Sequence, residues 1–366
     1  MLLWLRSLLC WLSCLSPLSS SPNDFWGFLA MSDAFVSLSN LTLSYGQTVA
    51  VPNLDLEIRE GELIALLGPS GCGKTTTMRA IAGLMTPSDG QITIDGSDVT
   101  RTPANKRGIG LVFQSYALFP HLSAFENVAF GLRLQKLPDA QIRAKTEAGM
   151  ATVGLTGFET RKPGEMSGGQ QQRLALARSL VMQPKVLLLD EPLSNLDARL
   201  RLEMRNELQR VQKDTGITMV FVTHDQSEAL ALADRVVLMK DGKIEQLGTP
   251  AELYAEPATA FVADFMGFEN IFRVEGKDLV SDQGRLPLGF NASKQLLAWR
   301  PGGVQVGSGP HKGRVLASSF AGGHREYVLE SALGQIKADA SIETPEVSIG
   351  EQIAFDLPQT TARPLA

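Results

Sequence analysis

The sequence predicts an α/β domain, in which helices cover both faces of a parallel sheet, followed by a small β-barrel-like domain. Apolar strand patterns such as LIALLG (residues 63–68), VLLLDEP (186–192) and TMVFVTHD (218–225) alternate with helical patterns up to about residue 267. Such alternation is typical of a parallel sheet covered on both faces. Later runs such as REYVLE (325–330) and EQIAFDL (351–357), separated by Gly, Pro and Ser, favour a small antiparallel barrel.

Composition is that of an ordinary globular protein. The chain has 366 residues, 44% of them hydrophobic and 20% charged, with a formal net charge of −5, which is enough for one large or two medium domains. The acidic balance and the lack of a long basic run indicate no nucleic-acid partner. The three cysteines, Cys10, Cys14 and Cys72, cannot form a disulfide framework, so the chain fits a reducing compartment.

Residues 1–30 differ from the rest of the chain. They contain an apolar run of signal-peptide length with one arginine, followed by a serine-rich patch. Ser and Pro interrupt this run too often for a membrane span. Two interpretations stay open, a secretion signal and a start placed upstream of the true one, and Met31 favours the second. No later stretch is long and apolar enough for a bilayer, so we expect any membrane role to depend on a partner.

The first elements follow from local patterns. Apolar and polar residues alternate over residues 34–58, as in half-buried strands, and residues 63–68 form a buried strand. GQITIDGSDV (90–99) indicates a hairpin around Asp95 and Gly96. Ser123 and Glu126 form a capping box that opens a helical stretch to about Val153. With a helix over residues 167–183, which Pro184 stops, we expect an inserted helical subdomain at about residues 119–183.

The remaining elements complete the predicted organisation. A long charged helix spans residues 197–215, a shorter helix spans 226–234, and strand RVVLMK (235–240) leads to a hairpin turn at Asp241 and Gly242. We place a boundary near residue 268. The prediction is an α/β domain over residues 34–267 and a β domain over residues 268–366.

GPSGCGKT (residues 68–75) fits the phosphate-loop pattern and lies between a strand and a helix, as that motif requires. In this pattern Lys74 places a positive charge on the β and γ oxygens, and the Thr75 hydroxyl ligates Mg²⁺. The sequence therefore predicts ATP and Mg²⁺ as cofactors. The expected nucleotide contacts are Gly68, Pro69, Ser70, Gly71, Cys72, Gly73, Lys74, Thr75 and Thr76.

Polar side chains follow three predicted strands at the same sheet edge. Asp190 ends a strand and is placed to hold Mg²⁺, and Glu191 is placed to orient and deprotonate a water molecule. His224 follows another strand, where we expect it to contact the γ-phosphate. Gln114 ends GIGLVFQ (108–114), where it fits a Mg²⁺ ligand or a water contact. The alternatives are a solvated Asp-Glu turn and a merely packed or surface histidine.

A second anion site is predicted in MSGGQQQRLALARS (residues 166–179). Ser167 and Gln170 form a capping box at a helix start, and Gly168 and Gly169 leave the backbone there bare. Unpaired amides and the helix dipole make such a start a good anion site. No lysine lies here, and one nucleotide needs only one cradle.

These motifs resemble those of the ATP-binding subunits of ABC transporters, in family order, from about Phe35 to Gly267. The resemblance makes residues 68–75 the Walker A motif, Gln114 the Q-loop residue, MSGGQ the signature, VLLLDEP the Walker B motif, SNLD (194–197) the D-loop and His224 the switch histidine. Tyr45 matches the aromatic residue that stacks on adenine. Met166 replaces the family's usual Leu, a near-isosteric change of little expected effect.

The resemblance implies a P-loop NTPase fold: a RecA-like core with an antiparallel β subdomain and a helical insert. It also gives the second anion site a use, since two copies of such subunits pack head to tail. Ser167, Gly168, Gly169 and Gln170 would then bind the γ-phosphate of the partner's ATP. That contact is lost with ADP, so hydrolysis would open the homodimer.

The stretch from His224 to Phe272 resembles importer ATPases, and the tail from Glu269 resembles their short TOBE-like domain. AWRPGGV (298–304) is a loose version of the family's Arg-Pro segment. This resemblance implies an energising subunit on the cytoplasmic face of the inner membrane, bound to permease subunits and served indirectly by a substrate-binding protein. The tail favours polyamine as cargo, with ferric iron, 2-aminoethylphosphonate and sugar as alternatives. A soluble ABC ATPase acting on DNA or ribosomes and an exporter ATPase are the competing functions.

Overall fold

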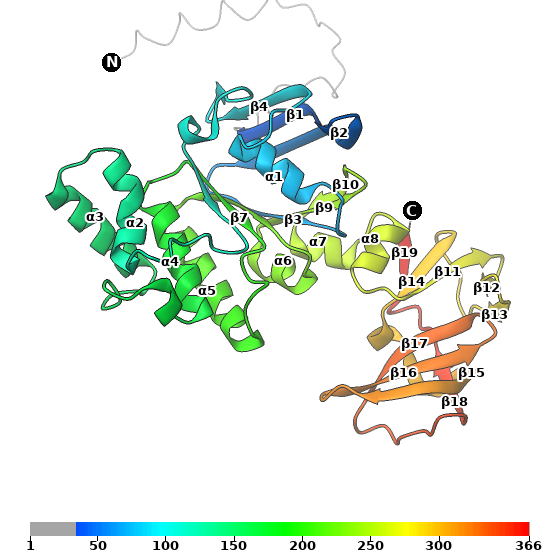
Figure 1. The fold of residues 1–366 in the computed structure, drawn as a ribbon. Helices are drawn as coiled ribbons and strands as arrows, with labels where there is room; N and C mark the ends of the chain where they lie inside the picture. Colours follow the sequence, from blue (N-terminus) through cyan, green and yellow to red (C-terminus); the bar gives the residue numbers. More distant parts are fainter. Residues whose placement is uncertain (1–33, 366) are drawn as a thin grey trace, which may run out of the picture.

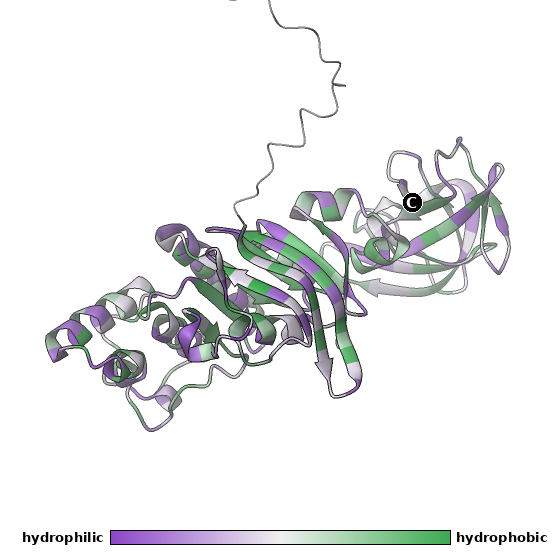
Figure 2. Cartoon of the chain, turned by 90° about the horizontal axis from the view of Figure 1, so that it is seen from above, coloured by the Kyte–Doolittle hydropathy of each residue, from purple (hydrophilic) through white to green (hydrophobic). Residues whose placement is uncertain are grey.

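The protein is described here by a computed structural model that covers residues 34–365. The predictions for residues 1–30 lie outside these residues. Figure 1 shows a central sheet, a group of helices (α2–α5) beyond one side of it and a separate β-rich region at the C-terminal end of the chain. In Figure 2, hydrophobic and hydrophilic residues alternate along the long strands, as expected for strands with one face on a core.

The central sheet has six strands in the order β10-β9-β3-β8-β7-β6, and all neighbours are parallel except β10 and β9. Side chains of β3, β7 and β8 are buried on both faces, which explains their continuous apolar sequence. The strands are β3 (Leu63–Leu67), β6 (Ile109–Val112), β7 (Val186–Asp190), β8 (Thr218–Val222), β9 (Arg235–Lys240) and β10 (Lys243–Gly248).

Alternate residues of this sheet enter different cores. Leu63, Ala65 and Leu67 pack in a core with α4, α5 and α6, whereas Ile64 and Leu66 pack in another with α1 and an antiparallel sheet. The order of that second sheet is β2-β1-β4-β5. The elements are α1 (Lys74–Ala82), β1 (Ala34–Tyr45), β2 (Thr48–Arg59), β4 (Asp89–Ile94) and β5 (Ser97–Asp98).

The helices follow the predicted starts more closely than the predicted ends. Ser123 caps α2, and the Ser167–Gln170 capping box opens α4. α4 ends at Leu180 rather than at residue 183, because Gln183 precedes a proline and has a φ of 52°. The helices are α2 (Ala124–Leu134), α3 (Asp139–Thr152), α4 (Gly168–Leu180), α5 (Ala198–Thr215), α6 (Gln226–Leu232), α7 (Pro250–Ala255) and α8 (Ala260–Phe265).

Helix α6 likewise ends two residues before the predicted limit. Asp234 instead forms two hydrogen bonds with Leu63 of β3. Its amide donates to the carbonyl of Leu63 (2.8 Å), and its carboxylate accepts from the amide of Leu63 (2.8 Å). The turn residues behave as predicted, since Asp241 and Gly242 both have positive φ (47° and 79°), as a two-residue hairpin turn with this twist requires.

The C-terminal region confirms the predicted β domain and consists of two antiparallel sheets, β13-β12-β11-β14-β19 and β17-β16-β15-β18. Trp299, Tyr327 and Phe355 lie in their shared core. Asn270 joins the sheets through two hydrogen bonds with the backbone of Lys337. The strands are β11 (Asn270–Glu275), β12 (Asp278–Val280), β13 (Arg285–Pro287), β14 (Leu296–Trp299), β15 (Gln305–Phe320), β16 (His324–Ser331), β17 (Gly334–Ser341), β18 (Gln352–Asp356) and β19 (Arg363–Leu365).

Three short 3₁₀ segments complete the described chain: η1 (Ala104–Lys106), η2 (Pro163–Glu165) and η3 (Pro301–Gly303). Within residues 34–365, none of the helices combines the length and the apolar character needed to span a membrane.

Candidate nucleotide-binding site

The loop between β3 and α1 is shaped by its glycines. Gly68 has a φ of 145°, and a Cβ atom there would lie 2.3 Å from the carbonyl oxygen of Met239. Gly73 has a φ of 102°, and a Cβ atom there would lie 2.7 Å from a methyl group of Val51. Any other residue would strain the backbone and collide with neighbours at both positions. The loop therefore keeps the tight curve that brings its amides around a phosphate.

Lys74 is held inside this loop. Only 7% of the residue is exposed, and its ammonium group donates to the carbonyls of Gly68 (2.7 Å) and Pro69 (2.9 Å). No carboxylate forms an ion pair with Lys74 among the residues that the structure describes. The positive charge is thus fixed at the loop without being neutralised, which suits the binding of a phosphate group.

Thr75 and Asp190 meet at the carboxyl end of β7. The Thr75 hydroxyl donates to Asp190 Oδ1 at 3.5 Å. Burial and the neighbouring Glu191 charge raise the pKa of Asp190, and Arg79, Thr75 and Lys74 oppose them. A hydroxyl and a carboxylate are oxygen donors of the type that Mg²⁺ prefers, and a cation would favour the ionised carboxylate. The described residues contain no cluster of three His, Cys, Asp or Glu ligands.

Glu191 lies between the other two predicted catalytic residues. Its Oε1 is 3.2 Å from His224 Nδ1, and its Oε2 accepts from Gln114 Nε2 at 3.0 Å. Glu191 has a φ of 43°, which is unusual for a residue with a side chain, and its amide donates to the carbonyl of Val222 at 3.0 Å. The fold therefore brings Gln114, Glu191 and His224 together in one hydrogen-bonded group.

Residues outside the predicted set position Gln114. Ser194 Oγ accepts from the side-chain Nε2 of Gln114 at 3.3 Å, and Asn195 Nδ2 donates to the backbone carbonyl of Gln114 at 2.8 Å. Arg178, near the end of α4, donates to the carbonyls of Tyr116 (2.9 Å) and Ala117 (2.7 Å). The SNLD motif of the sequence analysis includes Ser194 and Asn195. No sequence pattern links Arg178 to the loop that follows Gln114.

The start of α4 is set as the capping box predicts. Ser167 Oγ accepts from the Gln170 amide at 3.3 Å, and the Gln170 side chain accepts from the Ser167 amide at 3.0 Å. Ser167 and Gly168 are exposed, and Met166 is buried, as an apolar residue should be. Within residues 34–365, no hydrogen bond joins this start to the phosphate loop.

Tyr45 and Thr76 flank the phosphate loop. Tyr45 ends β1, 52% of it is exposed, and its hydroxyl lies 3.5 Å from Thr76 Oγ1 at the start of α1. An exposed aromatic ring beside the loop offers a stacking surface for a base. This is the placement expected from the sequence.

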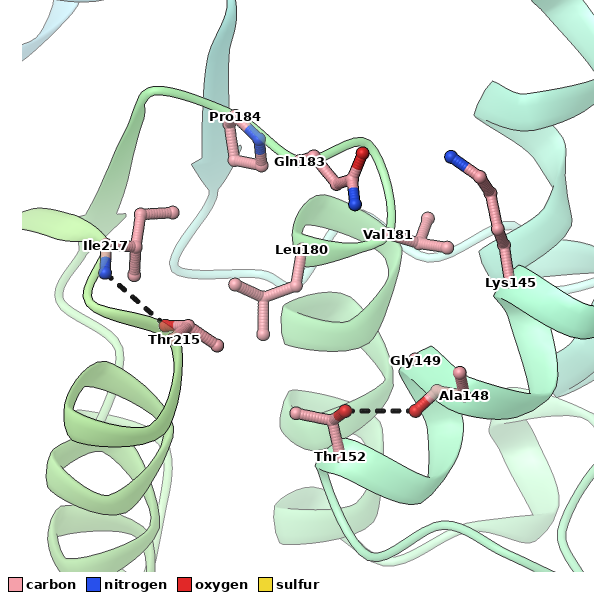
Figure 3. A pocket seen from close by; sticks show the side chains of 10 residues that line it. All are labelled: Lys145, Ala148, Gly149, Thr152, Leu180, Val181, Gln183, Pro184, Thr215 and Ile217. Carbon is pink, nitrogen blue, oxygen red and sulfur yellow. Dashed lines mark hydrogen bonds between the residues drawn. The ribbon is translucent and has the colours of Figure 1, made fainter.

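A separate cavity of about 500 Å³ lies between α3, the end of α4 and the link from α5 to β8 (Figure 3). Leu180, Val181 and Ile217 give it an apolar wall, and Lys145 lies at its rim. None of the predicted nucleotide contacts lines it. The cavity is therefore separate from the phosphate loop.

Comparison with known proteins agrees with this geometry. A model of the ABC transporter family matches residues 51–194. The chain is 51% identical over 315 residues to the Fe(3+) ions import ATP-binding protein FbpC of Rhizobium etli, which covers 82% of this chain and 89% of that protein. It is 44% identical over 320 residues to the spermidine/putrescine import ATP-binding protein PotA of Mesoplasma florum, with 84% and 91% covered.

Solved structures agree as well. CbiO1 from Clostridium perfringens, part of an ABC transporter complex, has a TM-score of 0.58 and 33% identity, and the match covers 61% of this chain and 92% of that one. A dimeric ATP-binding cassette in a post-hydrolysis state with ADP and Pi has a TM-score of 0.53 and 33% identity, with 59% and 98% covered. The chain belongs to the ABC transporter family, as an ATP-hydrolysing, ATP-binding subunit of the importer type.

Proposed function

We propose that this chain powers an importer of ferric iron. Relatives that carry the ferric-iron name are 51%, 48% and 46% identical to it, and the relative that carries the polyamine name is 44% identical. Ferric iron, an alternative in the sequence analysis, therefore replaces polyamine as the main proposal. The names of these relatives also support permease subunits as partners, with this chain bound to them at the cytoplasmic face of the inner membrane.

The proposed ATP site uses the residues around the phosphate loop. The ring of Tyr45 stacks on adenine, the backbone from Gly68 to Gly73 wraps the phosphates with Thr76 beside it, and Lys74 contacts the β and γ oxygens. Thr75, Asp190 and Gln114 hold Mg²⁺, which neutralises charge on the phosphates when it is bound. The Thr75–Asp190 distance of 3.5 Å supports a shared cation there.

The observation that carries the proposed chemistry is the group formed by Gln114, Glu191 and His224. Glu191 takes the proton from the attacking water, and Gln114 and His224 hold its carboxylate through contacts of 3.0 and 3.2 Å. His224 then has its other ring nitrogen available for the γ-phosphate. Because positive φ at Glu191 costs energy, the fold maintains this carboxylate in place at some expense of stability.

The exposed start of α4 supports a homodimer with a shared nucleotide. In this arrangement Ser167, the amides of Gly168 and Gly169, and Gln170 bind the γ-phosphate of the ATP held by the partner's phosphate loop. The dimeric relative with ADP and Pi supports such a pairing. Loss of the γ-phosphate removes this contact, so hydrolysis separates the two subunits.

The test combines cargo and catalysis in one set of strains. Cells that lack this gene are complemented with the wild-type chain, Glu191→Gln, or the control Glu203→Gln, an exposed α5 carboxylate paired with Arg199. We expect radioactive ferric iron, but not spermidine, to accumulate with the wild type and the control only. Purified Glu191→Gln should lose about 10²–10⁴-fold in ATPase rate and stay dimeric with ATP in size-exclusion chromatography. Spermidine uptake would contradict the cargo, and brisk hydrolysis by Glu191→Gln would contradict the base.

A further inference from the structure

A second cavity, of about 570 Å³, lies where helices α6 and α7 meet the C-terminal sheets. Its lining joins Gln226 of α6 and Tyr254 of α7 to Arg300 in the Arg-Pro segment, Asp339 of β17 and Arg363 of β19. None of the residues assigned above to ATP, Mg²⁺ or catalysis lines it. The proposed transport function gives this cavity no role.

Arg300 is fixed in the wall of this cavity. Its guanidinium carbon lies 3.5 Å from the ring centre of Tyr254 and 3.8 Å from that of Phe268, so two aromatic rings contact it. Its Nε and Nη2 groups donate to the carbonyl of Met266 (3.2 and 3.1 Å), and Nη2 also donates to that of Tyr254 (2.7 Å). Its Nη1 group has no hydrogen bond with any described residue, so a pre-organised donor is left over.

The cavity carries an excess of positive charge. Neither Arg300 nor Arg363 forms an ion pair within residues 34–365, and burial, with a smaller contribution from the charge of Arg363, lowers the pKa of Arg300 while Tyr254 opposes it. Glu269, at the rim, is paired with Lys337 instead. Asp339 is the remaining acid in the lining, so the two arginines face one carboxylate there. Two arginine side chains in one lining, neither in an ion pair with a described residue, favour a bound anion there.

We propose that this cavity binds a small organic anion with a carboxylate or phosphate group, held by the guanidinium groups of Arg300 and Arg363. Guanidinium groups recognise both anions through paired hydrogen bonds. The volume is that of a site for a small organic molecule, and Tyr254, which is 47% exposed, supplies apolar surface that such a molecule contacts. Gln226 places the occupied site next to α6, the helix that follows His224.

The test is isothermal titration calorimetry, which measures the affinity of the full chain for citrate and, separately, for inorganic phosphate. All proteins carry Lys74→Ala, so that the phosphate loop contributes less to anion binding. We expect citrate to bind, and Arg363→Gln to weaken that binding about tenfold or more. The control is Arg285→Gln, an exposed arginine of β13 outside the cavity, which should leave the affinity unchanged.

Asp339→Asn provides the opposite change, because it removes negative charge from the lining. We expect it to tighten citrate binding by a few-fold, which a variant that only disturbs folding would not do. Citrate affinity that is equal in the Arg363→Gln and Arg285→Gln proteins, or weaker in Asp339→Asn, would overturn the site. Phosphate that binds as tightly as citrate would overturn the inference that the apolar walls select an organic anion.

Discussion

Arg107 stabilises the far end of the helix that starts at the phosphate loop. It is 4% exposed, and its Nη1 group donates to the carbonyls of Ala80 (2.6 Å) and Ile81 (2.8 Å) in the last turn of α1. Its Nε and Nη2 groups donate to the carbonyls of Thr102 (2.7 Å) and Thr100 (3.0 Å). Burial lowers its pKa, but an arginine stays charged at neutral pH. Arg107→Met removes all four bonds and the charge at the helix end.

The loss of stability can be worked out from these contacts. A hydrogen bond to a charged group contributes about 1.5–3 kcal/mol, and a cation at a helix C-terminus about 0.3–1 kcal/mol. These contributions do not add fully. The Ala80 carbonyl keeps a second donor in the Gly83 amide (3.1 Å), and the burial of the arginine charge itself costs free energy. We expect Arg107→Met to lower the free energy of unfolding by about 3–5 kcal/mol.

Thermal unfolding followed by circular dichroism measures this loss. With about 2–4 °C per kcal/mol for a large domain, the melting temperature should fall by about 10 °C. Arg107→Lys keeps the charge but has one donor group, so an intermediate value is expected. Arg101→Met, an exposed change in the same loop, should stay within about 0.5 kcal/mol of wild type. A melting temperature for Arg107→Met within about 2 °C of wild type would refute the reasoning.

Two further predictions concern titratable groups. Burial and Glu191 raise the pKa of Asp190, so its ionised form destabilises the nucleotide-free fold above that pKa. Asp190→Asn should raise the melting temperature at neutral pH and lower the Mg²⁺-dependent ATPase rate about 10²-fold or more, and a lower melting temperature would contradict this account. Burial lowers the pKa of His311 from its usual 6.5, so the unfolded chain binds the proton more readily and stability falls as pH drops through 6.5. His311→Phe, which keeps an aromatic ring tilted against Phe355, should flatten that loss in melts recorded from about pH 7.5 to 5.5. An unchanged pH slope would show that other groups cause the loss.

Much of the fold was predictable because its sequence patterns are local. Continuous apolar runs predicted β3, β7 and β8, since strands buried on both faces lack the alternation of polar and apolar residues. The errors fell at helix ends, where distant contacts decide. Asp234 leaves α6 because the sheet binds its side chain and its backbone, and Leu63, far away in the sequence, provides that contact. A window of neighbouring residues contains no sign of it.

In the candidate site, too, the residues found from the sequence follow local patterns, and those missed depend on distant contacts. Glu191, His224 and Gln114 were found because each follows a strand, and parallel strands end at one edge of a sheet. Their mutual contacts confirm that placement in space, whereas their catalytic roles stay predictions. The supporting role of Asn195, which lay in the SNLD motif, and the residue Arg178 were missed for a physical reason. Asn195 and Arg178 reach the loop of Gln114 through bonds from a side chain to a backbone carbonyl, which any sequence accepts.

Helix α4 connects the two halves of the proposed mechanism. In the proposed dimer its first turn faces the partner's ATP with Ser167. Arg178 in its last turn holds the backbone of Tyr116 and Ala117, just after Gln114. Tyr116 and Ala117 both have positive φ (61° and 47°), so this loop keeps its shape only while other contacts hold it. We expect a displacement of α4 at the proposed dimer interface to move the backbone at Tyr116 and Ala117, and with it Gln114, which contacts Glu191. Closure of the proposed dimer would then be coupled through α4 to the position of the proposed base, because one helix carries both contacts.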